Sequence, residues 1–139
     1  MSAADFLDTN ILVYAYDSSS PGKQGIAKEL VRQAFAGGGV ISSQVLSELA
    51  AALLHEFSPP TPAKSLNAIL DALDPIKLIV ADTDLIRRAV EPHATYGLHF
   101  YDGMIVAAAE RAGCERIWSE DLNSGQKYFG ITVTNPFHT

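Results

Sequence analysis

The stretch from residue 5 to residue 14 constrains the fold more than any other part of the chain. An apolar run reaches Asp8, two small polar residues follow, and a second apolar run then begins. This pattern is typical of a buried strand that ends where a helix starts, with a carboxylate at the junction. Because ligand sites in open α/β sheets lie beyond the carboxyl ends of the strands, we expect chemistry at Asp8.

The rest of the chain repeats this alternation of strand and helix patterns. We predict strands over residues 4–8, 40–42, 77–81, 116–119 and 131–134. The spacing of apolar residues predicts helices over 23–35, 43–57, 62 to about 73, 82–94 and 101–112, and a shorter helical segment at 10–16. This order indicates an α/β sandwich around a parallel sheet. We expect one domain, because no linker or repeat interrupts the 139 residues.

Helix starts are predicted from the residues that cap them. Ser43 and Thr61 each precede a helical pattern, and Pro62 suits the first helical position. The last helix is expected to begin at Tyr101 or Asp102, and its centre is apolar on every side, as in a buried helix.

Composition places the chain among globular proteins and weighs against a membrane location. Apolar residues make up 47% of the sequence, charged residues make up 19%, and the longest apolar runs are too short to span a bilayer. The first residues lack the cationic segment of a secretory signal. A single cysteine, Cys114, cannot form an internal disulfide, so we expect a cytoplasmic protein in which Cys114 is a packing residue.

Four carboxylates are predicted to reach the same edge of the sheet. Asp8 ends the first strand, Glu48 lies one turn into the helix after the second, Asp102 opens the buried helix, and Asp121 follows the fourth strand. Singly, each aspartate could be only a turn or cap residue. Together, carboxylates about 5 Å apart repel by roughly 3 kcal/mol per pair at an effective dielectric near 20, so such a cluster needs protons or cations.

Glu48 belongs to a polar stripe on its helix, which also contains Gln44, Ala52 and His55. Such a stripe is either a solvated helix face or the wall of a cleft that alanine keeps open.

We interpret the four histidines as surface or structural residues, with His55 the one most in need of a structural check. No paired histidine spacing of a metal site is present.

The donor types select both a cation and a reaction. Oxygen ligands favour Mg²⁺ or Mn²⁺ over zinc or copper, and Mg²⁺ combines a few carboxylates with water and phosphate oxygens. Metal-assisted phosphodiester hydrolysis is the natural chemistry of such a site. The net charge of −6 argues against a passive nucleic-acid clamp, which would need a basic surface, more than against a metal-dependent nuclease.

Four short motifs, in order, resemble those of PIN-domain ribonucleases: Leu7-Asp8-Thr9-Asn10, Ser47-Glu48-Leu49, Tyr101-Asp102-Gly103-Met104-Ile105 and Ser119-Glu120-Asp121-Leu122. The closing Asn123, Gly125-Gln126 and Val133-Thr134-Asn135-Pro136-Phe137 resemble the tail of VapC toxins of toxin–antitoxin pairs. Each motif is weak by itself, whereas the ordered set spans nearly the whole chain.

This resemblance implies a single PIN-like domain over residues 1–139, a three-layer α/β/α sandwich around a mainly parallel sheet of about four to five strands. It implies a Mg²⁺-dependent ribonuclease, with Mn²⁺ as a possible substitute, that cleaves RNA, binds a cognate antitoxin and forms homodimers. The catalytic and metal-binding residues would be Asp8, Glu48, Asp102 and Asp121, supported by Thr9, Asn10, Ser119 and Asn123.

Two positions depart from the family pattern. Many members carry an acidic residue at the position of Asn123, and its neutral side chain would leave a second metal weaker or absent. Gly103 replaces a more usual alanine or serine, which we expect to loosen the start of its helix.

Two other functions stay open from the sequence. A phosphatase or phosphotransferase would use Asp8 as a nucleophile, but such enzymes commonly have a second aspartate where this chain has Asn10. A non-catalytic PIN-like module that only binds a partner is the third possibility, and the complete set of four acids counts against it.

Overall fold

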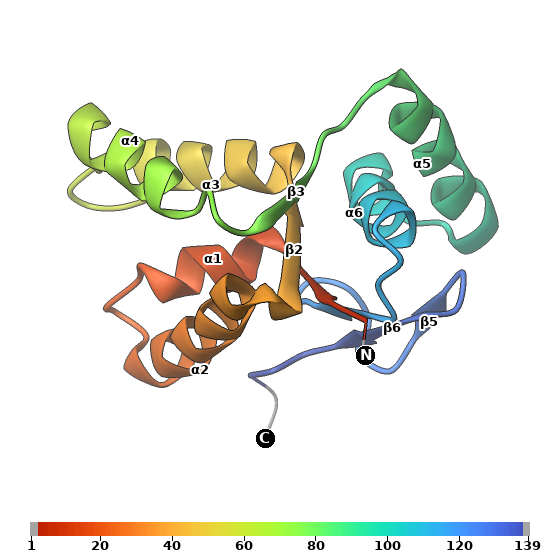
Figure 1. The fold of residues 1–139 in the computed structure, drawn as a ribbon, viewed down its shortest axis with the longest axis horizontal. Coiled ribbons are helices and arrows are strands. Elements are labelled where there is room, and N and C mark those ends of the chain that lie inside the picture. The colour runs from red at the N-terminus through yellow and green to blue at the C-terminus, as the bar shows by residue number, and fades with distance from the viewer. Residues whose placement is uncertain (1–2, 138–139) are drawn as a thin grey trace.

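A computed structural model of the chain describes residues 3–137 and contains one six-stranded sheet in the order β3-β2-β1-β4-β6-β5 (Figure 1). The strands are β1 (Asp5–Leu7), β2 (Gly39–Ser42), β3 (Lys77–Ile79), β4 (Arg116–Trp118), β5 (Lys127–Tyr128) and β6 (Ile131–Thr134). All neighbours from β3 to β6 in this order are parallel. The mainly parallel sheet predicted from the sequence is therefore confirmed.

The strand that the sequence pattern missed is β5, which pairs antiparallel with β6 at the edge of the sheet. Phe129 and Gly130 connect them with φ values of 51° and 80°, and positive φ at both positions is what a tight hairpin requires. A strand of two residues is too short to show the alternation by which longer strands are recognised.

The helices lie close to their predicted positions. They are α1 (Thr9–Ala15), α2 (Pro21–Gln33), α3 (Ser43–His55), α4 (Ala63–Ala72), α5 (Thr83–Tyr96) and α6 (Phe100–Arg111), and a π-helical turn, η1 (Ala34–Gly38), follows α2. Within residues 3–137, no helix has both the length and the apolar character needed to cross a membrane.

The predicted caps of two helices and the predicted start of a third differ from the structure. Ser42, not Ser43, caps α3, because its hydroxyl accepts the N–H three residues on at 3.3 Å. Pro62 is the flanking residue of α4, so Thr61 does not cap that helix. His99 caps α6, so Asp102, in the first turn of α6, is not its capping residue.

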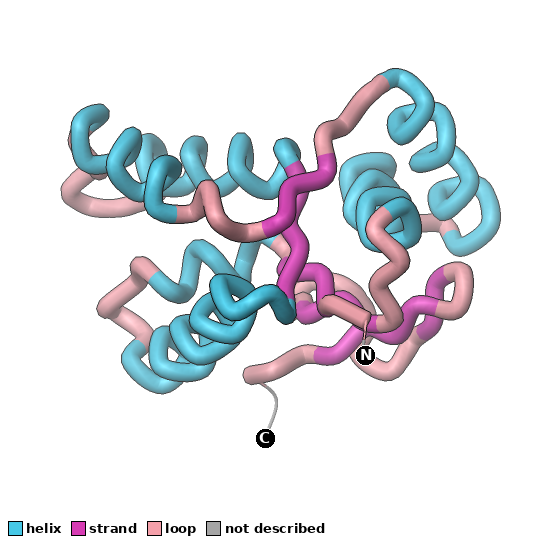
Figure 2. The backbone as a smooth tube through the Cα atoms, viewed as in Figure 1, coloured by secondary structure: helices cyan, strands magenta, loops and turns pink. Residues whose placement is uncertain are grey.

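The helices form two layers, one on each side of the sheet. The first four helices pack together on one side, and α5 and α6 pack together on the other (Figures 1 and 2). The three-layer α/β/α arrangement is therefore confirmed. Because β1 lies between β2 and β4, the chain reverses its direction of sheet growth there, and the carboxyl ends of β1 and β4 border the crevice where α/β proteins bind ligands.

Helix α6 is buried from Gly103 to Ala109, as its apolar sequence predicted. A Cβ atom on Gly103 would lie 2.6 Å from the Ala89 carbonyl oxygen and 3.6 Å from Cβ of Pro92, both on α5. We expected this glycine to loosen the helix start. The structure gives it a different role, since the close approach of α5 and α6 leaves no room for a side chain.

Candidate functional site

The site is built on the junctions that follow β1 and β4. The backbone N–H of Asp8 donates to the Trp118 carbonyl at 3.0 Å, so these junctions are joined as an extension of the sheet. The Ser119 hydroxyl donates to Oδ2 of Asp8 at 2.7 Å. Two residues 111 positions apart in the chain thus meet at the crevice that the strand order creates.

Asp8 is a buried carboxylate, with only 5% of its surface exposed. Its Oδ1 accepts the Thr9 N–H at 2.7 Å, so Asp8 caps α1. Burial raises the pKa of the Asp8 carboxyl from 3.8 to about 6. Hydrogen bonds from Ser119 and Thr9 oppose the rise, while the charges of Asp121 and Glu48 add to it.

Asn10 links α1 to the turn that carries Asp121. Its amide nitrogen donates to Oδ2 of Asp121 at 3.1 Å, and its amide oxygen accepts the Glu120 N–H at 3.1 Å. The Ser119 hydroxyl oxygen accepts the Asp121 N–H at 3.1 Å. Residues 119–126 form turns rather than a helix, so Asp121 has no helix to cap.

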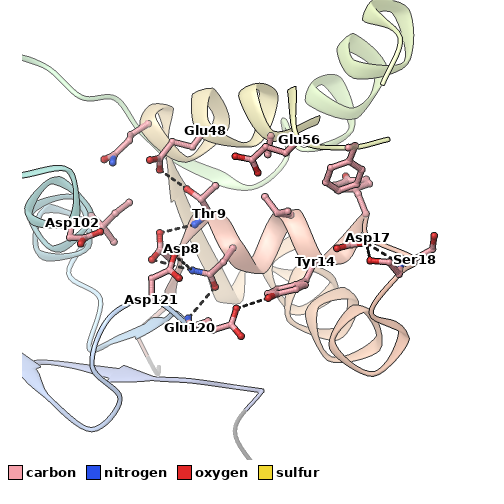
Figure 3. Close-up of a pocket in the computed structure, with 18 of the residues that line it drawn as sticks. Asp8, Thr9, Tyr14, Asp17, Ser18, Glu48, Glu56, Asp102, Glu120 and Asp121 are labelled. Carbon is pink, nitrogen blue, oxygen red and sulfur yellow. Dashed lines mark hydrogen bonds between the residues drawn. The ribbon is translucent and has the colours of Figure 1, made fainter. Parts of the chain in front are cut away.

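Glu48 and Asp102 reach the same region from the two helical layers. Glu48 projects from α3, and the Thr9 hydroxyl donates to its Oε1 at 2.7 Å (Figure 3). Asp102 lies in the first turn of α6, on the other side of Asp8 (Figure 3). Burial and the neighbouring charge of Asp121 raise the pKa of Asp102, and His99 partly offsets this rise.

A cleft of about 790 Å³ runs past all four predicted acids. It also contains three acids that sequence reasoning did not select, Asp17, Glu56 and Glu120, and no lysine or arginine among the described residues that line it. The Tyr14 hydroxyl donates to Glu120 at 2.6 Å, and Lys23 forms an ion pair with the same carboxylate. The cleft therefore carries a strongly negative lining.

The structural check on His55 agrees with its interpretation as a surface residue. His55 is exposed and does not line the cleft, although Gln44, Glu48 and Ala52 of the same predicted stripe do. Glu56, one residue further on, lies at the cleft instead. Glu48, Ala52 and Glu56 are spaced by four residues, and this spacing was the available signal that α3 presents Glu56 there.

Asn123 was predicted to support the acids, but the structure places it outside the cleft lining with its side chain exposed. It instead makes hydrogen bonds that lower the pKa of Tyr128, although burial has the larger effect and leaves that pKa raised. In this structure Asn123 therefore contacts Tyr128 of β5 and does not line the cleft.

The donor chemistry suits a divalent cation, although the side chains do not form a cage. Over residues 3–137, no three histidine, cysteine, aspartate or glutamate side chains are grouped closely enough to hold a metal ion directly. Mg²⁺ is commonly held by one or two carboxylates, with water and phosphate oxygens completing its shell. The raised pKa values of Asp8 and Asp102 show the electrostatic cost that a cation in this cleft would relieve.

The fold and the cleft define a class of protein: an α/β/α domain with an acidic crevice at the switch point of a parallel sheet. The sequence matches the family model of the PIN domain over residues 6–128, and the chain belongs to that family. Searched against curated proteins, the sequence has no significant match.

Solved structures share the fold at low sequence identity. VapC20 of Mycobacterium tuberculosis, described as a toxin that cleaves the sarcin-ricin loop, matches with a TM-score of 0.64 and 19% identity over 85% of this chain and 92% of that one. A toxin–antitoxin complex from Klebsiella pneumoniae matches with a TM-score of 0.69 and 20% identity, over 96% of this chain and 98% of that one. FitAB bound to a DNA fragment matches with a TM-score of 0.63 and 15% identity, over 97% of this chain and 96% of that one.

Proposed function

We propose that this chain is a metal-dependent endoribonuclease, the VapC-type toxin of a toxin–antitoxin pair. The observation that carries the proposal is the approach of four carboxylates, Asp8, Glu48, Asp102 and Asp121, to one cleft in a PIN domain. The similar structures include a toxin that cleaves the sarcin-ricin loop and a toxin–antitoxin complex, and both support this function. The proposal extends to one domain over the whole chain, an antitoxin partner, a homodimer and a cytoplasmic location.

In this proposal the four acids would hold Mg²⁺ or Mn²⁺ together, one or two of them by direct contact and the others through water. When bound, the cation supplies positive charge to the phosphate and lowers the pKa of the attacking water. Thr9 orients Glu48, and Asn10 orients Asp121. Ser119 stabilises the ionised form of Asp8, because a donated hydrogen bond favours the carboxylate.

The alternative use of Asp8 as a nucleophile has less support. Its Oδ2 accepts the Ser119 hydroxyl and the residue is buried, so little of the carboxylate is free to attack a phosphate. Asn10, the position at which a phosphatase would have an acid, has its amide bonded to Asp121. Phosphate trapped covalently on Asp8 would revive this function.

The test is RNA cleavage by the purified chain with Mg²⁺, with Mn²⁺ and with EDTA. We expect Asp102→Asn to lower the rate by more than about a hundredfold, since metal charge contributes several kcal/mol to transition-state stabilisation. Asp71→Asn is the matched control, because Asp71 is exposed on α4 and does not line the cleft. Cleavage in EDTA, or at the wild-type rate in Asp102→Asn, would contradict the proposal.

A non-catalytic module predicts a different set of results. It would cleave no RNA under any of these conditions, and its thermal stability would not respond to millimolar Mg²⁺ or Mn²⁺. A cation that binds the acidic cleft only in the folded state must instead raise the stability of the protein.

A further inference from the structure

A second hollow of about 360 Å³ adjoins the acidic cleft and shares Gln44 and Glu48 with it. Its walls include the exposed ring of Tyr101 and the buried side chain of Met104. Ser43 also lines this hollow, and its hydroxyl oxygen accepts the Ala81 N–H at 3.0 Å while keeping its own proton to donate. A mostly apolar hollow with a few polar groups is typical of a small-molecule or base pocket.

Tyr101 stands out because its ring is both exposed and held in place. It is 57% exposed, the second highest value among the large apolar and aromatic side chains of residues 3–137. Its ring stacks on that of His99, with centroids 5.7 Å apart and planes at 26°, and Phe100 meets it edge-on at 5.6 Å. The Gln44 amide donates to the Tyr101 carbonyl at 3.0 Å. The result is a fixed aromatic platform immediately before Asp102.

The charge of the neighbouring cleft indicates what such a platform would bind. Among the described residues, neither the cleft nor the hollow is lined by a lysine or arginine. Lys23, beside the cleft, is already paired with Glu120. An RNA backbone therefore gains little affinity from basic side chains here, and contacts to its bases must supply more of it. Stacking on an aromatic ring is the sequence-tolerant way to provide them.

We propose that the Tyr101 ring, backed by His99, stacks the nucleobase next to the scissile phosphate, and that the hollow beside it receives that base. Ser43 would then donate a hydrogen bond to the base edge. This inference rests on the proposed ribonuclease function and adds to it a substrate-binding residue outside the acidic set. It commits to single-stranded RNA, because a base inside a duplex cannot present its face to a ring.

The experiment is a double-mutant cycle that removes the ring, the base or both. The probe is a fluorescein-labelled single-stranded RNA of about ten nucleotides, with an abasic residue placed at each position flanking the cleavage site in turn. Cleavage kinetics with Mg²⁺ are compared for wild type, Tyr101→Phe, Tyr101→Ala and the control Phe35→Ala, which removes an exposed ring in η1 outside both hollows.

We expect Tyr101→Ala to raise KM about tenfold or more on intact RNA and to have almost no effect at one abasic position, while Tyr101→Phe stays within about twofold of wild type. Equal losses on intact and abasic RNA at every position would overturn the proposal. So would unchanged cleavage by Tyr101→Ala together with a loss of dimer or antitoxin binding, which would make this a protein-binding surface. Failure of the wild type to cleave any RNA would instead count against the ribonuclease function itself.

Discussion

Replacing Asp8 with asparagine should make the metal-free protein more stable at neutral pH, even though it removes a proposed metal ligand. Asp8 is buried, and its pKa rises from 3.8 in the unfolded chain to about 6 in the folded one. Such a shift is equivalent to about 3 kcal/mol that folding loses when the group ionises. This stability is fully present below the pKa of Asp8 in the unfolded chain, 3.8. It is lost as the pH rises through the pKa of Asp8 in the folded protein, about 6.

About 2 kcal/mol of this loss falls between about pH 4.5 and about pH 7.5, which are practical conditions for unfolding measurements. The asparagine carbonyl can accept the Thr9 N–H, but its amide nitrogen would face the Ser119 hydroxyl, whose oxygen already accepts the N–H groups of Asp121 and Leu122. Allowing about 1 kcal/mol for that mismatch, Asp8→Asn should gain about 2 kcal/mol at neutral pH. The melting temperature should rise by several degrees.

The assay is urea and thermal unfolding in EDTA at both pH values, repeated with Mg²⁺ in place of EDTA. Asp8→Asn should flatten the pH dependence and lose the stabilisation by Mg²⁺ that we expect in the wild type. Glu56→Gln is the matched control, because it removes an exposed carboxylate of the same cleft. If Asp8→Asn is less stable than wild type at neutral pH, or if Glu56→Gln flattens the pH dependence equally, the burial argument is wrong.

Three further predictions follow from single contacts. Gly103→Ala should lower the free energy of unfolding by about 1–3 kcal/mol, because its Cβ would lie 2.6 Å from the Ala89 carbonyl oxygen; urea unfolding measures this, and an unchanged midpoint would contradict it. Ser119→Ala removes a hydrogen bond that lowers the Asp8 pKa, so the loss of stability between acidic and neutral pH in the metal-free protein should become larger and extend to higher pH; a smaller loss would be inconsistent with the site. Cys114 is buried with its thiol pKa raised to about 11, so a thiol reagent should label it only after unfolding; rapid labelling of the native protein would count against this.

Local pattern was sufficient for the order of the elements and for much of the acidic set. The apolar run that stops at Asp8 marks the end of one strand, and it can be recognised without knowing any distant residue. The same holds for the buried centre of α6, whose apolar sequence leaves no face for water. These features follow from backbone geometry and burial, which repeat with a fixed period along the chain.

The tertiary structure decided everything that depends on which strand lies beside which. Only the placement of β1 between β2 and β4 brings Asp8 against Ser119, and no periodicity reports it. The exact rotation of α3 selected Glu56 rather than His55 for the cleft, because one residue turns a helix by about 100°.

The stretch that opens the chain therefore has two levels of explanation. The sequence alone determined that a carboxylate, Asp8, stands where a buried strand meets a helix. Only the folded sheet determined that this carboxylate is buried, bonded to Ser119 and raised in pKa to about 6. The physical reason is that desolvation and charge coupling arise from residues far apart in sequence, which become neighbours only when the sheet assembles.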